Sequence, residues 1–380
     1  MTHYDYIIAG AGCAGLSFLV RLLQTERFSD KKILLIDRQP KTSNDRTWCF
    51  WEKETGYFDE VVYKRWQQLR FAHPNYTTQY EIFPYTYKMI RAIDFYQHCF
   101  SIVHRYPNVD IRYEPVMSIG NNLSGACVTT DTTTYQATQV FNSIQLQPPV
   151  LAKNQYFLLQ HFKGWFIETP TPSFDPACAT LMDFRVDQSP GTSFVYVMPF
   201  TPTTALVEYT VFSPSVLSQP AYDAGLKDYL QNIINIGNYK ICEEETGAIP
   251  MTNYRFPRND GAITWLGTAG GQTKSSSGYT FQFIQKQADQ LVQALLQQQP
   301  LSHRQTFSDK RFGWYDAILL NILSHNTLPG DVIFKDLFLN NKITDILQFL
   351  DNETSVLQEM KIVWGLPKKV FLRAAWQQLL

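Results

Sequence analysis

Residues 5–23, DYIIAGAGCAGLSFLVRLL, and residues 31–39, KKILLIDRQ, decide the fold of this chain. The short apolar run from Tyr6 to Ala9 predicts a β-strand, and the spacing of apolar residues from Leu16 to Leu23 predicts an α-helix. A second apolar run, Ile33 to Ile36, predicts the next strand. A strand, a helix and a strand in this order are typical of a parallel α/β sheet.

A glycine turn connects the first predicted strand to the helix. Gly10, Gly12 and Gly15 have the spacing G-x-G-x-x-G, and Asp37 closes the second strand about twenty residues after the last glycine. The helix N-terminus offers N–H groups and a positive dipole end to a pyrophosphate, and the acid can bind a ribose hydroxyl. We therefore expect a bound dinucleotide. The pattern alone does not separate FAD from NAD, and an ordinary glycine turn is the less favoured interpretation.

Composition limits the class of protein. The net charge of −1, from 33 Lys and Arg against 34 Asp and Glu, gives no electrostatic footprint for a nucleic-acid partner. The 380 residues are enough for a large core and two or three sub-domains. An aromatic share of 14% fits a bulky core, and it also suits a long apolar tunnel.

The cysteines favour a reduced, cytoplasmic protein. They are scattered, with no C-x-x-C pair and no His/Cys cluster of ligand spacing, so we expect neither a disulfide framework nor a metal site. The N-terminal run lacks the basic start of a signal peptide, and no eighteen uninterrupted apolar residues predict a membrane span. The six are Cys13, Cys49, Cys99, Cys127, Cys178 and Cys242.

The middle of the chain has β-rich character. Residues 39–56, QPKTSNDRTWCFWEKETG, are polar and predict a loop, and residues 91–105 predict a helix. Residues 155–215 are rich in β-branched and aromatic residues and predict antiparallel strands. Within them, FVYVMPF (194–200) and ALVEYTVFS (205–213) predict a hairpin.

Helices dominate the last part of the chain. Residues 221–237 predict one helix, another follows the sequence GTAGGQTKSSSGYTF, and the remainder is mostly helical with breaks near Pro329 and Pro367. We predict an α/β (α+β) fold: a discontinuous Rossmann-type nucleotide-binding domain, an inserted antiparallel β substrate domain and C-terminal helices. This arrangement resembles p-hydroxybenzoate-hydroxylase-type flavoproteins, and the resemblance implies that the first domain is an FAD-binding domain. The expected ranges are 1–60, 88–150 and 245–298 for the FAD domain, 61–87 and 151–244 for the substrate domain, and 299–380 for the helical region.

A second glycine loop, Leu266 to Gly271, follows an apolar strand and precedes a helix. Two-part FAD proteins commonly have such a loop against the ribityl-phosphate or the flavin, often with an acid where this chain has Thr268. A simple tight turn is the alternative. Arg91, at the start of a predicted helix, is a candidate for the FAD phosphates, and a solvated helix start explains it equally well.

Glu208 lies mid-strand in LVEYTVF and shares one strand face with Leu206 and Phe212. If that face is buried, desolvation raises the pKa of the carboxyl, which then remains protonated as a general acid. From the usual exposure of glutamate, a solvent-facing edge strand is the favoured interpretation. Glu243, Glu244 and Glu245 form a charge run that predicts a solvated face or turn.

Taken together, these segments resemble bacterial lycopene β-cyclases over nearly the whole chain, and the plant enzymes more distantly. The most specific match is NDRTWCFW (44–51); others are LVEYT (206–210), Glu244-Glu245 before Ile249-Pro250-Met251, and the loop from Gly267 to Phe281. Tyr209 stands where the plant motif has a second glutamate.

The resemblance implies cyclisation of lycopene ends through γ-carotene to β-carotene without net redox change, with reduced FAD kept reduced by NAD(P)H. It assigns the catalytic acid to Glu208. The alternatives are an FAD/NADPH-dependent redox enzyme, such as a polyprenyl reductase or aromatic monooxygenase, and a carotenoid-binding protein without activity. The residues expected at the cofactor are Gly10, Ala11, Gly12, Ala14, Gly15, Asp37, Arg38, Arg91, Gly267, Gly270 and Gly271.

Because lycopene resides in bilayers, the resemblance also implies peripheral membrane association. The segment KKVFLRAAWQQLL (368–380) is basic and apolar-faced, which suits an interfacial helix. Docking of a last helix onto the core is the other interpretation. Ring type, one or two cyclised ends, the deprotonating base and the oligomeric state do not follow from the sequence.

Overall fold

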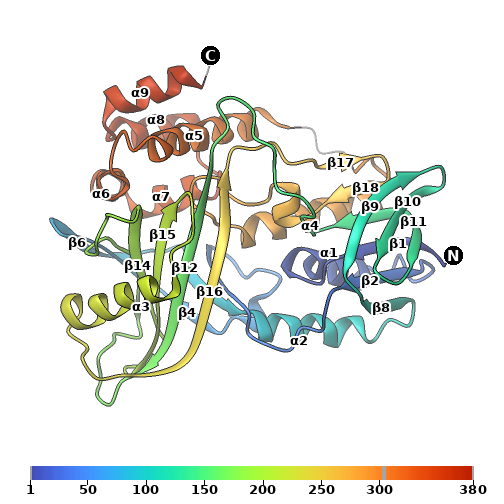
Figure 1. Ribbon diagram of the computed structural model, residues 1–380, viewed down its shortest axis with the longest axis horizontal. Coiled ribbons are helices and arrows are strands. Elements are labelled where there is room, and N and C mark those ends of the chain that lie inside the picture. The colour runs from blue at the N-terminus through green and yellow to red at the C-terminus, as the bar shows by residue number, and fades with distance from the viewer. Residues whose placement is uncertain (1, 302–304, 379–380) are drawn as a thin grey trace.

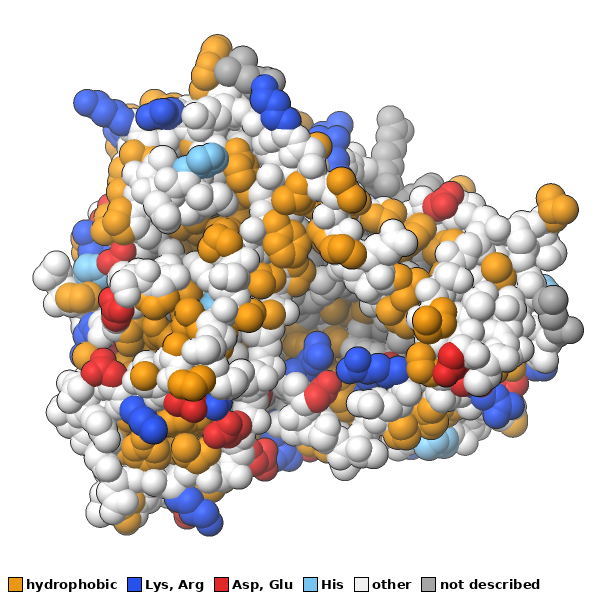
Figure 2. Space-filling view, viewed as in Figure 1, with side chains coloured by type: hydrophobic (Ala, Val, Ile, Leu, Met, Phe, Trp, Pro, Cys, Tyr) orange, Lys and Arg blue, Asp and Glu red, His pale blue; other side chains and the backbone are white. Residues whose placement is uncertain are grey.

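The computed structural model describes residues 2–301 and 305–378, which form two lobes with a helical C-terminal region (Figure 1). One lobe contains an eight-stranded sheet, and the other contains a seven-stranded sheet. Figure 2 shows the surface hollowed between the lobes, with Lys or Arg side chains at the edge of the hollow.

The eight-stranded sheet has the order β17-β18-β11-β1-β2-β8, and its β18, β11, β1, β2 and β8 run parallel. β9 and β10 form an antiparallel meander that leads into β11. Alternate residues of β2 belong to different cores: Ile33 and Leu35 pack under helices α1, α2 and α4, and Leu34 and Ile36 pack under the meander. Burial on both faces explains the uninterrupted apolar run. The elements of this lobe are β1 (His3–Ala9), α1 (Cys13–Gln24), β2 (Ile33–Asp37), α2 (Ala92–Val103), β8 (Val109–Tyr113), β9 (Val116–Asn122), β10 (Gly125–Thr130), β11 (Thr134–Asn142), β17 (Asn259–Asp260), β18 (Ile263–Trp265) and α4 (Phe281–Leu296).

The seven-stranded sheet has the order β16-β12-β15-β14-β13-β5-β6 and is antiparallel except for the pair of β13 and β5. Its two faces support two separate cores. Val207, Tyr209 and Val211 of β15 face the core under α3, whereas Leu206 and Phe212 face the core shared with the C-terminal helices. The elements are β5 (Gln68–His73), β6 (Tyr76–Glu81), β12 (Phe157–Glu168), β13 (Cys178–Asp183), β14 (Thr192–Pro199), β15 (Thr204–Ser213), α3 (Gln219–Asp228) and β16 (Lys240–Thr252).

A three-stranded sheet, in the order β3-β7-β4, joins the lobes; its strands are β3 (Thr47–Glu52), β4 (Lys64–Trp66) and β7 (Thr86–Arg91). The prediction of a loop over residues 39–56 is therefore wrong for β3. The reason is alternation: Trp48 and Phe50 pack against the core of the lobe with the eight-stranded sheet, while Cys49 and Trp51 pack against the core of the lobe with the seven-stranded sheet. Because each face of this strand packs against a core, its apolar residues do not alternate with polar ones, and the usual pattern of a half-buried strand is missing.

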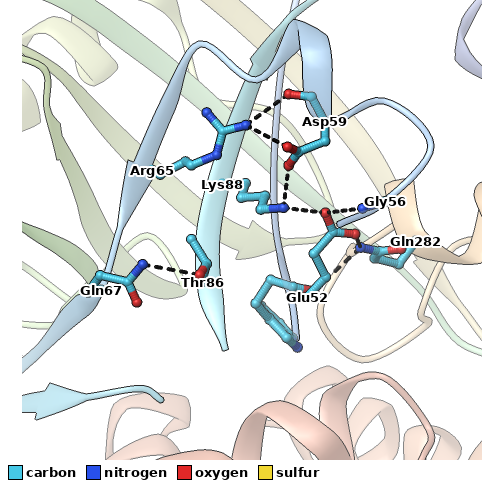
Figure 3. Close-up of polar contacts among 9 residues, drawn as sticks. Glu52, Gly56, Asp59, Arg65, Gln67, Thr86, Lys88 and Gln282 are labelled. Atoms are coloured by element: carbon cyan, nitrogen blue, oxygen red, sulfur yellow. Dashed lines mark hydrogen bonds and ion pairs between the residues drawn. The ribbon is translucent and has the colours of Figure 1, made fainter. Parts of the chain in front are cut away.

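The buried side chain of Lys88 fixes this small sheet (Figure 3). Its ammonium lies 2.6 Å from both Glu52 and Asp59. The Gln282 amide at the start of α4 donates to the other oxygen of Glu52 at 3.1 Å. These contacts tie β3 and β7 to the helix that follows the second glycine loop.

The C-terminal helices cover the seven-stranded sheet on the Leu206 face. Pro329 and Pro367 cap α6 and α9, which confirms the predicted breaks. The hairpin of β14 and β15 is also confirmed. The helix predicted over 221–237 ends earlier than expected, with α3 continuing in a π-helical turn, Tyr229–Ile233. In the described ranges, no helix is both long and apolar enough to cross a bilayer. The helices are α5 (Phe307–Ser324), α6 (Gly330–Asn340), α7 (Ile343–Leu350), α8 (Val356–Trp364) and α9 (Lys368–Gln377).

Candidate active site

In the first glycine loop (residues 10–15), the structure favours glycine at each of the three positions for a different reason. Gly10 has φ +99°, and a Cβ there would lie 2.2 Å from Ser143 Oγ. A Cβ on Gly15 would lie 1.9 Å from Gly10 O, so the helix could not pack against the strand. At Gly12 a Cβ would meet nothing within 4 Å. The open position is the one at which a pyrophosphate approaches the backbone in dinucleotide folds.

The start of α1 is suited to an anion. Within the described chain, no side chain caps it and its first turn contains no acid. Asp37 at the end of β2 is buried and accepts a hydrogen bond from the Ala11 N–H at 2.7 Å. Lys41 Nζ donates to the other oxygen of Asp37 at 3.3 Å. Asp37 therefore holds the loop and stands beside it, whereas its neighbour Arg38 is exposed.

The second glycine loop (residues 266–271) packs directly on the first. Gly267 has φ +56°, and a Cβ there would lie 2.6 Å from the Cβ of Ala14. A Cβ on Gly270 would lie 2.4 Å from Trp265 O, and Gly271 has φ +74°. Thr268 Oγ1 lies 3.1 Å from Thr273 Oγ1, so its hydroxyl has a partner in the loop itself. The two loops, which are far apart in sequence, form one continuous backbone surface.

Arg91 caps α2 and has two partners of its own. Its guanidinium bonds Asp94 at 2.7 Å and lies 4.0 Å from the centroid of the Tyr63 ring. Arg46, which sequence reasoning overlooked, lies close enough to the start of α1 to influence the thiol of Cys13. Its charge lowers the Cys13 pKa against the larger rise to about 12 that burial causes. Arg91 stays a prediction for the cofactor phosphates, and the structure adds Arg46 as a second arginine near the first glycine loop.

Glu208 is buried. It lies in β15, between β12 and β14, so the interpretation as a solvent-facing residue of an edge strand is wrong. Its side chain shares a face with Leu206 and Phe212 and the residue is 8% exposed. Thr210 Oγ1 donates to Glu208 Oε1 at 2.8 Å.

Glu245 of β16 is the residue that sequence reasoning missed. It was expected with Glu243 and Glu244 on a solvated face; those two are exposed, but Glu245 is 6% exposed. Its Oε2 accepts a hydrogen bond from Thr47 Oγ1 at 2.8 Å. Gly164 of β12 is the register partner of both Glu208 and Glu245, so the two glutamates flank one glycine on the same sheet face.

The two carboxyls perturb each other. Burial raises the pKa of Glu208 well above its ordinary value, the charge of Glu245 raises it further, and the Thr210 hydroxyl lowers it. Burial also raises the pKa of Glu245, to about 6, against the lowering effect of the Thr47 hydroxyl. The burial of Glu208 and the neighbouring charge of Glu245 both favour the protonated form of the Glu208 carboxyl, which is the form that a general acid needs.

Aromatic side chains surround the pair. Tyr196 of β14 is the register partner of Glu208, and the charge of Glu208 contributes to the rise in the pKa of Tyr279, which burial dominates. Trp51 packs edge-on against Tyr279 with ring centroids 4.7 Å apart. Cys49 lies on the same face of β3 as Thr47 and Trp51, and the charge of Glu208 reaches its thiol. The pair thus lies beside the buried side chains of Tyr196, Tyr279 and Cys49.

Comparison with known proteins decides the family. The profile of the family described as "Lycopene cyclase protein" matches residues 5–376. The chain belongs to the lycopene cyclase family. It is 26% identical over 264 residues to lycopene beta-cyclase of Pantoea ananas, and 28% over 234 residues to lycopene beta-cyclase of Paracoccus sp. strain N81106. These matches cover 66% and 60% of this chain and 63% and 56% of the relatives, so the chain spans about three-fifths of each relative's length.

Solved structures show which fold this lycopene cyclase family member shares with other proteins. A geranylgeranyl bacteriochlorophyll reductase-like protein from Thermoplasma acidophilum superposes with a TM-score of 0.69 at 14% identity, over 99% of this chain and 100% of that one. The p-nitrophenol 4-monooxygenase of Pseudomonas putida gives a TM-score of 0.60 at 11% identity, over 100% and 98%. The shared fold confirms the predicted fold class.

A cavity of this lycopene cyclase family member is lined by neither carboxyl of the pair. Its volume is about 1320 Å³, and Thr268, Gly270 and Gly271 line it together with residues of α4 and α5. Its lining includes Lys274 and Arg258 and neither Glu208 nor Glu245. The described residues contain no cluster of three or more His, Cys, Asp or Glu side chains that could hold a metal.

Proposed function

We propose that the chain is a lycopene β-cyclase that isomerises the ends of lycopene through γ-carotene to β-carotene. The observation that carries the proposal is the burial of the Glu208 carboxyl beside Glu245 and aromatic side chains, which raises its pKa and favours its protonated form. An isolated trisubstituted alkene is a weak base, so its protonation needs an acid that stays neutral in a dry site. The family membership supports the substrate class.

The cofactor proposal rests on the two glycine loops. Gly12 leaves the backbone open to a pyrophosphate, Asp37 stands where a ribose hydroxyl binds, and Gly267 holds the second loop against the first. The residues present therefore fit FAD, with Arg46 and Arg91 as phosphate partners. Reduced FAD, with NAD(P)H as its reductant, supplies an anionic ring system that stabilises nearby positive charge.

The protein residues perform the proton transfers. Glu208 gives its proton to the terminal alkene, and the tertiary cation attacks an internal double bond to close a six-membered ring. Loss of a ring proton then leaves the β-type double bond. Tyr196, Trp51 and Tyr279 present aromatic faces that stabilise the cation and exclude the water that would otherwise trap it.

A pigment assay tests this function. Expression in a lycopene-accumulating host is expected to convert lycopene to β-carotene, and Glu208→Gln is expected to retain flavin and lose conversion. Conversion with NAD(P)H consumed in proportion to product would instead support a redox flavoenzyme. An active Glu208→Gln variant would refute the assignment of the acid.

We further propose that α8 and α9 hold the enzyme at an anionic bilayer. Leu357, Trp364 and Leu372 are exposed by 73%, 74% and 70%. Lys368 Nζ lies 3.7 Å from the Trp364 ring centroid, which places a cation beside the apolar group. Ala374 is buried, so α9 both docks on the core and presents a free apolar edge. Residues 379 and 380 lie outside the described residues.

Vesicle sedimentation tests the membrane contact. Trp364→Ser combined with Leu372→Ser is expected to release the protein from vesicles of mixed neutral and anionic lipid while flavin content is unchanged. Met117→Ser, at an exposed position on β9 of the other lobe, is the matched control. Equal sedimentation of the double variant and the control would place the contact elsewhere.

A further inference from the structure

The register of the seven-stranded sheet brings Glu208 and Glu245 together across one residue. Gly164 of β12 pairs with Glu208 of β15 on one side and with Glu245 of β16 on the other. A Cβ on Gly164 would lie 2.9 Å from Leu206 Cδ1 and 3.1 Å from Glu245 Cγ. The absent side chain therefore leaves the space in which the two carboxyl groups meet.

The hydrogen bonds of the pair leave one position open. Thr210 and Thr47 each donate to one oxygen of Glu208 and Glu245, respectively. Glu245 Oε1 is buried and accepts no hydrogen bond of regular geometry from the described residues. Because the two carboxyls also interact directly, Glu208 is the group that can share a proton with this oxygen.

The other titratable groups around the pair cannot compensate a second negative charge. Cys49 of β3 and Tyr196 of β14 face Glu208 and are themselves buried acids, and Glu243 adds negative charge from β16. No lysine, arginine or histidine from the described ranges contributes to the pKa of either glutamate. Two adjacent buried carboxyls without a cation hold one proton between them.

We propose that Glu245 is the positioning residue of a proton-sharing pair: its carboxylate keeps Glu208 protonated before the reaction and makes the Glu208 carboxylate basic enough to recover the ring proton afterwards. This inference rests on the proposed cyclase function. A C–H bond forms at the terminal alkene, a C–C bond closes the ring, and a ring C–H bond breaks. One proton leaves Glu208 and one returns, so no oxidant or reductant is consumed and the acid is reset.

The pH dependence of lycopene conversion by the full-length, flavin-loaded protein tests the pair. Glu245→Gln removes the negative neighbour, which lowers the pKa of Glu208. The alkaline limb of the rate profile is therefore expected to move to lower pH by about one unit, because one unit corresponds to a modest charge interaction. Glu245→Asp keeps the charge and is expected to restore most of the wild-type limb.

Glu244→Gln is the matched control. It is the adjacent residue, but its side chain is exposed and bonds Lys163 at 3.0 Å. We expect its pH profile to equal that of the wild type. A second readout does not need activity: it is the component of the infrared carbonyl band of buried protonated carboxyls that Glu208→Gln removes. Followed against pH, this Glu208 component is expected to titrate at lower pH in Glu245→Gln.

The outcomes separate this inference from the function on which it rests. If Glu208→Gln converts lycopene normally, the proposed acid is wrong. If Glu208→Gln is inactive but Glu245→Gln has the wild-type rate profile and carbonyl titration, only the pairing is wrong. If Glu245→Gln does not fold, Glu245→Met, a neutral side chain of similar length, replaces it. A carbonyl band that titrates in this variant as it does in Glu244→Gln would contradict charge coupling.

Discussion

The two glycine loops and the two carboxyls are both built from distant parts of the chain, yet only the loops can be recognised in the sequence. Gly267 meets Ala14 because both loops follow parallel strands that end at the same edge of one sheet. Glu208 meets Glu245 because β15 and β16 pair with opposite sides of β12. The first meeting depends on glycine itself, and the second depends on strand register.

The difference has a physical cause. A backbone that must approach another backbone or a phosphate excludes every side chain but hydrogen, so the requirement appears as glycine at fixed spacing. A carboxyl pair needs only two ordinary glutamates and the correct register. The one local trace of the pair is Gly164, which lies on neither of the strands that contribute the acids.

We expect the largest effect from a substitution in the first glycine loop. Gly12→Val adds a side chain where nothing lies within 4 Å, so the fold is expected to remain while the pyrophosphate position is blocked. We expect FAD affinity to fall by about 100-fold or more, which corresponds to about 3 kcal/mol. Flavin absorbance per protein and near-UV circular dichroism measure the two effects.

Gly15→Ala provides the contrast within the same loop. Its Cβ would lie 1.9 Å from Gly10 O, so we expect loss of thermal stability together with loss of flavin. A folded Gly12→Val variant that still binds FAD at wild-type affinity would show that the cofactor does not lie at this loop.

We expect the next largest effect from a substitution between the two carboxyls. Gly164→Ala places a methyl group 3.1 Å from Glu245 Cγ and 2.9 Å from Leu206 Cδ1. Overpacking of this kind costs about 1–3 kcal/mol and is expected to push the Glu245 carboxyl away from Glu208. Cyclisation is expected to fall by about 10-fold with FAD binding retained, because 1.4 kcal/mol corresponds to a factor of ten.

Gly120→Ala is the matched change, since a Cβ on that strand glycine meets nothing within 4 Å. We expect wild-type turnover from it. Equal turnover of Gly164→Ala and Gly120→Ala would mean that the close approach over Gly164 has no role in catalysis.

Much of the fold could be predicted because its signals are local. The strand, glycine turn and helix at the N-terminus, the second glycine loop and the hairpin around Glu208 each depend on neighbouring residues. The strand Thr47–Glu52 could not, because its polar flanks hid a segment with one core on each side.

Only half of the candidate site could be predicted from the sequence, for the same reason. Alternation along β15 placed Glu208 on the face of Leu206 and Phe212, but whether that face is buried depends on the C-terminal helices. The run of three glutamates gave no sign that Glu245 is the buried one, because its burial is set by pairing with Gly164 and contact with Thr47. Long-range register, rather than composition, separates Glu245 from Glu244.

We expect a smaller effect from removing the Thr47 hydroxyl that donates to Glu245. The Thr47 hydroxyl stabilises the charged form of Glu245, so Thr47→Val is expected to raise the Glu245 pKa above its present value of about 6. The acidic limb of the cyclisation profile should then move to higher pH by about one unit, the equivalent of a hydrogen bond to a charged group. Thr246→Val, at an exposed position next to Glu245, is the control, and identical limbs in both would contradict the role of Thr47.

The smallest effect concerns Asp351, a buried acid near the same aromatic cluster but without a carboxyl partner. Burial raises its pKa to about 7, against opposing charges of Lys286 and Lys274. Because the folded pKa exceeds the unfolded one, ionised Asp351 costs stability in full above pH 7, and the cost fades as pH falls towards the unfolded value. Asp351→Asn should therefore raise the Tm at pH 8 by about 2 °C, the equivalent of about 1 kcal/mol, and by less at pH 5. Differential scanning calorimetry measures this against Glu54→Gln, a change at an exposed acid, and a Tm gain that is equal at both pH values would assign the effect to packing rather than to a buried charge.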